Sequence, residues 1–455
     1  MLEDTIIAVS TPLGYGGLGV VRLSGARALP IARKIFRPLK DLRKIPPRRP
    51  VLGHLIDPGS GDPFEEAYLT FFASPWTYTR EDIVEISCHG SPIILEEVVR
   101  LGVSQGARLA HPGEFTLRAY LNGRIDIIQA EAVNDIIMAS SLKQARISFH
   151  QLEGSLSRTV SQMRTQIIRL LSQVEAAIEF PDENLQISRR SLSKACERTS
   201  QTLEKLVSSY DLGKVLTGGF SLVITGRANV GKSTLFNALL EKDRAIVTPY
   251  PGTTRDYLQE KVRIKDALFT LTDMAGIGTP SHPAEKEGVR RGKKMAAAGD
   301  GILLVLDASR KETREDKQLL KKYRSKPMVL VFNKTDLPVK MDIPGFKNLA
   351  QGRPCLEISA LKRVNLERLK TLIYRHFVPQ EKDYAEVILH LRQKLLLKDV
   401  LSCLEQAKTR LEEGCSEEIF AEELRKALPL VGQLTGEVRM DDVLEDVFSR
   451  FCVGK

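Results

Sequence analysis

The sequence predicts a multi-domain protein in which an α/β domain is inserted into a helical domain and an α+β domain comes first. Three observations predict this fold class. Strand-like apolar runs alternate with helical stretches over residues 215–380, amphipathic helical patterns lie on both sides, and residues 1–121 mix short strand-like runs with turns. Such alternation is typical of a parallel sheet with helices on both faces. The length of 455 residues also fits about three domains.

Residues 1–121 form the first predicted domain. Four β-favouring runs are separated by Gly, Pro and Ser: TIIAVS, GVVRLS, AYLTFFA and DIVEIS. Residues 14–19 spell G-x-G-x-x-G, but a strand-like run follows where a dinucleotide site needs a helix. We therefore expect a tight turn there. The pair Cys88-His89 has no partner ligands in the sequence around it, and we expect it to be structural.

Helical patterns fill residues 122–214 and 381–455, the two parts of the predicted helical domain. Apolar residues recur at spacings of three and four from about 125 to 179, Pro181 ends that run, and a further helix is expected over roughly 190–210. After residue 384, VILHLRQKLLLKDVLSCLEQAKTRLEE and EEIFAEELRKAL have helical patterns. Since the ends of a domain often lie close together, we expect the α/β domain at 215–380 to be an insertion.

Composition excludes several classes of protein. No run approaches the ~18 apolar residues of a membrane helix, and the N-terminal residues resemble neither a signal peptide nor an import presequence, so we expect a cytoplasmic protein. The six cysteines are scattered without a C-x-x-C pair, which argues against zinc modules and disulfides. A net charge of +10 fits either nucleic-acid binding or a solvated basic surface.

Residues 226–233, GRANVGKS, match the phosphate-binding pattern G-x-x-x-x-G-K-[ST]. The match follows the run FSLVIT and opens the helical run STLFNALL, which is the context this motif requires. Lys232 would reach the β- and γ-phosphates, and the Ser233 hydroxyl would bind Mg²⁺. We therefore predict a Ras-like P-loop domain. Its loop residues assigned to the nucleotide are Asn229, Val230, Gly231, Lys232, Ser233 and Thr234.

Three further motifs end predicted strands in the order expected of a GTPase. Asp273 would hold Mg²⁺ through water, and the Gly276 amide would contact the γ-phosphate. The Asp336 carboxylate can accept two hydrogen bonds from guanine, whereas adenine offers no matching pair of donors. We therefore predict that the chain binds and hydrolyses GTP. The assigned residues are Asp273, Met274, Ala275, Gly276, Asn333, Lys334, Thr335, Asp336, Ser359, Ala360 and Leu361.

The segment between the P-loop and Asp273 is expected to complete the magnesium shell, and Thr254 is the predicted ligand. Ile277 stands where signalling GTPases have a water-positioning glutamine, so hydrolysis must use another group. The residues of this segment assigned to GTP are Thr248, Pro249, Tyr250, Pro251, Gly252, Thr253 and Thr254.

Several longer strings now carry a specific resemblance. Five segments resemble the bacterial tRNA-modification GTPase family MnmE, also called TrmE. They are DTIIAVSTPLGYGGLGVVRLSG, YTREDIVEISCHGSP, GARLAHPGEFTLRAYLNGRIDIIQAEAV, the GTTRD segment and the tail FCVGK. The resemblance runs the full length. It implies a homodimer whose N-terminal domain mediates dimerisation and binds a 5-formyl-tetrahydrofolate-type one-carbon donor. It also implies modification of the tRNA wobble uridine at C5, adding aminomethyl or carboxymethylaminomethyl groups with the FAD-dependent partner MnmG (GidA), in a heterotetramer or larger complex.

The resemblance also implies roles for individual residues. Folate contacts would come from Arg22, Glu85, Arg124 and Lys455, since guanidinium and ammonium groups suit carboxylates and Glu85 can pair an amino-pyrimidine edge. A potassium ion would be held by Asn229, Thr248, Tyr250 and Thr253. Catalytic roles would fall to Lys232, to Glu285 as general base and to Cys452 in the C-x-G-K tail. Without the family, the spacing of Glu285 favours a solvated loop carboxylate over a general base.

Three departures from the family pattern stand out. Met274 replaces a threonine, Arg80 occupies a position where the family commonly has glycine, and residues 277–285 differ from the usual acidic segment. The alternative function is a ribosome-assembly GTPase of the Era or EngA type, acting as an RNA-binding switch. That class leaves the C-x-G-K tail without a purpose, and the sequence has no second P-loop.

Overall fold

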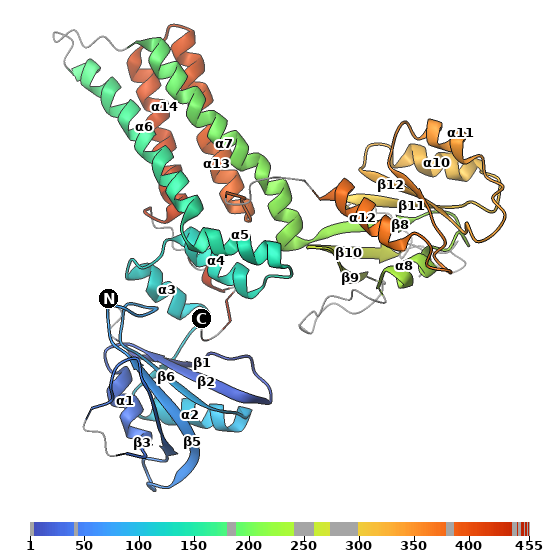
Figure 1. Cartoon of the computed structure of the whole chain (residues 1–455). Coiled ribbons are helices and arrows are strands. Elements are labelled where there is room, and N and C mark those ends of the chain that lie inside the picture. The colour runs from blue at the N-terminus through green and yellow to red at the C-terminus, as the bar shows by residue number, and fades with distance from the viewer. Residues whose placement is uncertain are drawn as a thin grey trace, which may run out of the picture. The chain divides into compact units, whose positions relative to one another are not determined.

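The computed structural model describes residues 4–40, 44–179, 188–240, 259–273, 299–378, 386–438, 444, 447–449, 451–452 and 454. The chain divides into two compact units. Unit 1 comprises residues 1–134, 151–192 and 409–455, and unit 2 comprises residues 135–150 and 193–408. Unit 2 therefore consists of two segments that are inserted in the chain of unit 1 (Figure 1).

Unit 1 contains a seven-stranded sheet that is antiparallel except where β7 joins β1. The four strands predicted from the sequence correspond to β1, β2, β5 and β6, whereas β3, β4 and β7 were not predicted. Residues 14–19 lead into β2 as a turn followed by a strand, as expected. The strands, in spatial order, are β3 (Phe36–Pro38), β4 (Pro50–Ile56), β5 (Pro63–Phe72), β6 (Ile83–Gly90), β2 (Gly16–Ser24), β1 (Ile6–Val9) and β7 (Arg108–Leu109).

Helices of unit 1 cover this sheet and form a separate helical layer. Apolar residues of α1 (Ala28–Lys34) and α2 (Pro92–Ser104) share one core with the sheet, and α3 (Glu114–Leu121) follows β7. The long helix α6 (Ser155–Glu179) packs against α14 (Glu417–Thr435), and Figure 1 shows the two side by side. The buried residues of α6 recur at helical spacing, so the pattern that predicted this helix also supplies its packing face.

Unit 2 contains the expected α/β sheet, in the order β13-β12-β11-β8-β10-β9. All neighbours are parallel except β9, an antiparallel strand that the sequence analysis missed. Its strands are β8 (Phe220–Thr225), β9 (Gln259–Ile264), β10 (Ala267–Asp273), β11 (Gly301–Asp307), β12 (Met328–Asn333) and β13 (Cys355–Glu357). Its shorter helices are α8 (Lys232–Leu240), α10 (Arg314–Lys322), α11 (Ile343–Leu349) and α12 (Leu366–Phe377).

The central position of β11 in the sheet explains why its sequence is an uninterrupted apolar run. Ile302, Leu304 and Leu306 pack in one cluster with residues of α10 and α11, whereas Leu303 and Val305 pack in another with residues of α8 and α12. A strand buried on both faces needs apolar side chains at every position. Both faces of the sheet are therefore covered, as the alternation of strands and helices predicted.

Four further helices contain residues of both units: α4 (Ile127–Ile137), α5 (Leu142–Leu152), α7 (Arg189–Gly218) and α13 (Leu391–Glu412). Helix α7 extends past the expected end near 210, and α13 begins only at Leu391, so residues 387–390 are not helical. Within unit 2, the Ile388 amide donates to the Ser209 hydroxyl at 3.1 Å, and Gly213 lies against the Ile388 carbonyl. Among the described helices, none combines the length and apolar character that a membrane span requires.

Candidate functional site

The connection between β8 and α8 in unit 2 forms the predicted phosphate-binding loop. Its backbone reaches positive φ at Gly226 (152°), Asn229 (63°) and Gly231 (95°). A Cβ on Gly226 would meet the Val305 carbonyl, and one on Gly231 would meet the Asn333 amide. Glycine is therefore required at both positions by backbone conformation and by close packing. The loop leads into the N-terminus of α8, and a helix N-terminus favours an anion.

The Lys232 side chain is buried within this loop. Its ammonium donates to the carbonyl oxygens of Gly226 at 3.0 Å and Arg227 at 2.7 Å. Ser233 and Thr234 follow in the first turn of α8 and are exposed. A lysine charge at the centre of a ring of backbone groups suits a phosphate chain. The geometry therefore agrees with the phosphate-binding role predicted for this motif.

Asn333, at the end of β12, forms hydrogen bonds to the phosphate-binding loop and to the segment that follows β13. Its Nδ2 donates to the Val230 carbonyl at 2.9 Å, and its Oδ1 accepts from the Ala360 amide at 2.9 Å. Lys334 donates to the Asn229 carbonyl at 2.6 Å and to Asp307 Oδ2 at 2.7 Å. The structure therefore brings residues 229–234, 333–336 and 359–361 to one edge of the sheet, as the sequence predicted.

The buried Asp307 carboxylate is a partner that the sequence analysis missed. Burial disfavours its ionised form, but hydrogen bonds from Lys334 and Ser309 outweigh that effect and hold the pKa of Asp307 below its usual value. The sequence did contain a signal for this partner, since an aspartate ends the apolar run GILLVLD of a buried strand. Because Asp307 stays ionised, it forms an ion pair with Lys334 and holds that side chain at the edge of the sheet where the nucleotide motifs lie.

Asp336 presents a carboxylate at the same edge. Its Oδ1 accepts a hydrogen bond from the Ser359 hydroxyl at 2.6 Å, and Ser359 in turn accepts from the Lys362 amide at 3.0 Å. Asp336 is exposed, and Oδ2 has no partner among the described residues. A carboxylate held from one side and open on the other can accept two hydrogen bonds from the guanine edge.

Other predicted nucleotide residues fall outside the described residues. These are Thr248, Pro249, Tyr250, Pro251, Gly252, Thr253, Thr254, Met274, Ala275, Gly276 and Glu285. Asp273 ends β10 and pairs in register with Ile224 of β8, the strand that leads into the phosphate-binding loop. Its backbone therefore lies at the expected end of the sheet.

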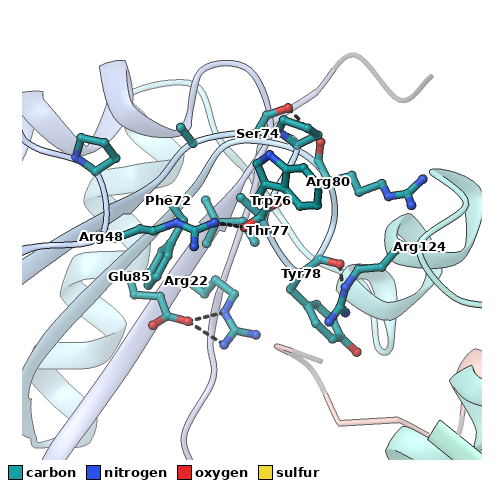
Figure 2. A pocket seen from close by; sticks show the side chains of 14 residues that line it. Arg22, Arg48, Phe72, Ser74, Trp76, Thr77, Tyr78, Arg80, Glu85 and Arg124 are labelled. Atoms are coloured by element: carbon teal, nitrogen blue, oxygen red, sulfur yellow. Dashed lines mark hydrogen bonds and ion pairs between the residues drawn. The ribbon is translucent and has the colours of Figure 1, made fainter. Parts of the chain in front are cut away.

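Unit 1 contains a second candidate site, a cavity of about 1160 Å³ beside the sheet (Figure 2). Arg22 of β2 and Glu85 of β6 stand directly opposite one another in the strand register, and both line the cavity with Arg124, which follows α3. Three of the four residues implied for folate are thus brought together. Lys455 lies outside the described residues.

The charged residues of the cavity have defined partners. Arg22 donates to Glu85 Oε1 from Nη2 at 2.7 Å and from Nε at 3.0 Å. The Arg124 guanidinium lies 4.7 Å from the centre of the Tyr78 ring, and burial raises the pKa of Tyr78. A cation above an aromatic face is attracted to it. The cavity thus offers one carboxylate, several guanidinium groups and aromatic surface.

The cavity also contains residues that the sequence analysis did not assign. Trp76 is the single tryptophan of the chain, is 81% exposed, and accepts a hydrogen bond at its carbonyl from Arg48 at 2.6 Å. Phe72 and Tyr78 add aromatic surface. The available signal was the string PWTYTR, in which aromatic residues alternate with threonines between a proline and an arginine.

A buried ionic cluster anchors the segment that carries these residues. Arg118 is 1% exposed and contacts three carboxylates, Asp4 at 2.8 Å, Glu114 at 3.0 Å and Glu81 at 3.2 Å. Glu81 also accepts a hydrogen bond from the Ser24 hydroxyl at 2.7 Å. Since Glu81 directly follows the cavity-lining residues 72–78 and 80, Arg118 holds one wall of the cavity in place.

The described residues near the C-terminus lie against the start of unit 1. The Cys452 carbonyl accepts from the Gly113 amide at 3.5 Å, and the Gly454 carbonyl accepts from the Ser10 hydroxyl at 3.3 Å. Cys452 is exposed and is not one of the residues that line the cavity. Cys88 is buried, and burial raises the pKa of its thiol to about 11, which agrees with the structural role expected for it.

The sheet of unit 2 and its phosphate-binding loop define the class: a P-loop GTPase. Comparison with known families then gives a specific match. Residues 127–452 match the MnmE helical domain, and residues 5–124 match the N-terminus of the GTP-binding protein TrmE. The chain belongs to the MnmE family of tRNA-modification GTPases. These matches favour tRNA modification over the ribosome-assembly alternative.

Individual relatives support the assignment over the full length. A tRNA modification GTPase MnmE of Thermoanaerobacter sp. (strain X514) is 40% identical, covering 100% of both chains. One from Geobacillus thermodenitrificans is 39% identical over 99% of both chains, and one from Koribacter versatilis is 39% identical over 100% of both. The predicted GTPase activity in tRNA modification is therefore confirmed at the level of the family.

Proposed function

We propose that this chain is a potassium-stimulated GTPase that modifies the wobble uridine of certain tRNAs at C5, using a tetrahydrofolate one-carbon donor. It works in the cytoplasm as a homodimer and with an FAD-dependent partner of the MnmG (GidA) type, in a heterotetramer or larger complex. Its domain boundaries lie near residues 121, 214 and 380. The observation that carries the proposal is the convergence of Arg22, Glu85 and Arg124 on one cavity.

The cavity fits a reduced folate in chemistry and in size. Glu85 can pair the amino-pyrimidine edge of a pterin, with Arg22 holding the carboxylate in position. Tyr78 and Trp76 offer aromatic surface for the rings, and Arg124 suits a glutamate carboxylate. Its volume is comparable with the upper end of small-molecule sites, about 1,000 Å³. A pterin with its aminobenzoyl-glutamate arm is a ligand of this kind.

In the nucleotide site, each residue has a distinct proposed task. Lys232 contacts the β- and γ-phosphates, Ser233 and Thr254 bind Mg²⁺, and Asp336 selects guanine. Glu285 is the general base for hydrolysis. Potassium bound near Asn229, with backbone oxygens of Thr248, Tyr250 and Thr253, supplies positive charge between the β- and γ-phosphates, where other GTPases use an arginine.

The ion requirement gives a direct prediction. GTP hydrolysis by the full chain should be at least about tenfold faster in potassium than in sodium at equal ionic strength, because sodium is too small to span the same oxygens. The Asn229→Ala variant should lose most of that difference. Initial phosphate-release rates in the two salts measure both effects. Equal rates for the unaltered protein would remove potassium from the proposal.

Two variants separate GTP turnover from tRNA modification. Glu285→Ala should keep GTP binding but slow hydrolysis by about 10²-fold, the loss expected for a general base, and it should also fail in modification. Cys452→Ser should keep the hydrolysis rate and abolish the modified wobble uridine. The readouts are phosphate release in vitro and nucleoside analysis of tRNA from a deletion strain carrying each variant. Full modification with Cys452→Ser would show that the tail is not catalytic.

A further inference from the structure

Arg80 adopts a backbone conformation that ordinarily belongs to glycine. Its φ is 60°, and an L-residue with a side chain is disfavoured there by roughly 1–2 kcal/mol. The neighbouring residues enforce this conformation, because the buried Thr79 hydroxyl bonds the Ser24 hydroxyl at 2.6 Å and accepts from the Glu81 amide at 3.2 Å. An arginine retained at such a position suggests a use for its side chain.

The charges that line the cavity are strongly unbalanced. Four arginines face a single carboxylate, and that carboxylate, Glu85, is already paired with Arg22. Arg48, Arg80 and Arg124 make no ion pair with any described residue. Each donates to one backbone carbonyl, although a guanidinium carries five N–H groups. The cavity therefore has more anion-binding capacity than its own residues use.

Two of these arginines lie on the same rim (Figure 2). Arg80 Nη1 donates to the Asn122 carbonyl at 2.8 Å, and a Cβ built on Gly123 would lie 3.5 Å from that nitrogen. Arg124 is the next residue along the chain, and it donates to the Tyr78 carbonyl at 3.3 Å. An anion bound at this rim could accept hydrogen bonds from the remaining N–H groups of Arg80 and Arg124.

We propose that Arg80 forms a second anion subsite next to Arg124, which holds the first glutamate carboxylate, and that this subsite binds the additional carboxylates of a γ-linked polyglutamyl tail on the reduced folate. This inference rests on the proposed folate function. Each further glutamate adds one carboxylate, and guanidinium groups match carboxylates well in geometry. Both arginines are exposed at the rim, where a tail leaving the cavity would pass. An RNA phosphate is the competing ligand, but the aromatic and carboxylate groups of the same cavity favour folate.

The test compares two probes that differ only in tail length: 5-formyl-tetrahydrofolate with one glutamate and with three. Because Trp76 is the single tryptophan and lines the cavity, its fluorescence reports binding to the full chain directly. Equilibrium dialysis gives an independent Kd. We expect the triglutamate form to bind about three- to tenfold more tightly at low salt, and this preference should shrink at high salt.

Substitutions of Arg80 test whether this residue causes the preference for the triglutamate form. Arg80→Gln and Arg80→Gly should each bring the two Kd values within about twofold, because the triglutamate form loses its extra contact. Arg80→Gly also relieves the backbone strain, so its thermal midpoint should be equal or higher and lost affinity cannot be attributed to unfolding. Arg37→Gln is the matched control, because Arg37 is exposed, donates to the Gly61 carbonyl at 3.4 Å and lies outside the cavity lining.

The possible outcomes are distinguishable. Equal affinity of the unaltered protein for both probes would overturn the subsite and leave the folate function intact. No binding of either probe, by fluorescence and by dialysis, would overturn the folate function and the subsite with it. If Arg80→Gln weakened tRNA binding and left the ratio of the two folate affinities unchanged, Arg80 would be a contact for RNA phosphate and the inference would be wrong.

Discussion

Replacing Asp336 by asparagine is expected to lower GTP affinity by about 10²- to 10³-fold and to raise affinity for xanthosine triphosphate. The carboxylate accepts two hydrogen bonds from guanine, and each bond to a charged group is worth about 1.5–3 kcal/mol. The asparagine amide would instead donate to the oxygen that xanthine carries in place of the exocyclic amine. Competition titrations with a fluorescent GTP analogue measure both affinities.

Ser359→Ala is the matched control for this experiment. It removes the hydroxyl that donates to Asp336 at 2.6 Å but leaves the carboxylate in place. GTP should bind this variant somewhat more weakly, without any gain in affinity for xanthosine triphosphate. An Asp336→Asn protein that bound GTP as tightly as the unaltered chain would remove Asp336 from the base site.

The Arg118→Met variant is expected to lose about 3–5 kcal/mol of stability in unit 1. Methionine fills much of the same volume, but it leaves Glu81 without this cation and leaves Asp4 and Glu114 with Arg108 alone, and Glu114 is only 4% exposed. Removing one partner of a buried ion pair typically costs this much. Urea unfolding followed by Trp76 fluorescence reports on the unit concerned.

The same cluster predicts a dependence on pH. Although burial opposes ionisation, hydrogen bonds from Arg108 and Arg118 hold the pKa values of Asp4 and Glu114 below their usual values. Carboxyls of this kind add stability above their unfolded pKa values, near 4, and that stability is lost as the pH falls through the lower folded values. The Arg118→Met protein should therefore lose less stability between pH 5 and 3 than the unaltered protein.

Arg100→Met provides the control for both measurements. Arg100 pairs with Glu97 one helical turn away on the exposed surface, where solvent screens the charges, so its loss should hardly change the stability. A comparably small loss in Arg118→Met would mean that the buried cluster does not stabilise unit 1. If Arg118→Met lost the full ~3–5 kcal/mol of stability but kept the acid sensitivity of the unaltered protein, the loss would come from packing and not from charge.

The nucleotide site could be predicted because its information is local. Each motif directly follows an apolar run, and the carboxyl ends of parallel strands meet at one edge of a sheet. Knowing that β8, β12 and β13 are strands therefore suffices to bring Lys232, Asp336 and Ser359 together. The antiparallel strand β9 was missed because QEKVRI is largely polar, and only its pairing with β10 identifies it as a strand.

The cavity of unit 1 could be predicted only in part, because its geometry depends on long-range register. Arg22 and Glu85 are 63 positions apart and face each other only because β2 and β6 pair in one register. A resemblance identified these two residues, whereas without it Arg22 would be interpreted simply as a surface charge. Arg118 gave no signal, since an arginine in EFTLRAYL looks like an exposed helical position until the three carboxylates around it are known.

The insertion of unit 2 into the chain of unit 1 affects the order in which the protein can fold. Helices α6 and α14 must pair across an interval of about 240 residues, and closing a flexible loop of that length costs about 5 kcal/mol of chain entropy. The sheet of unit 2 needs only strands between residues 220 and 357. On the ribosome, that sheet can form while α14 is still being synthesised. The sheet of unit 1 is synthesised first, but unit 1 can finish folding only after α14 has been synthesised.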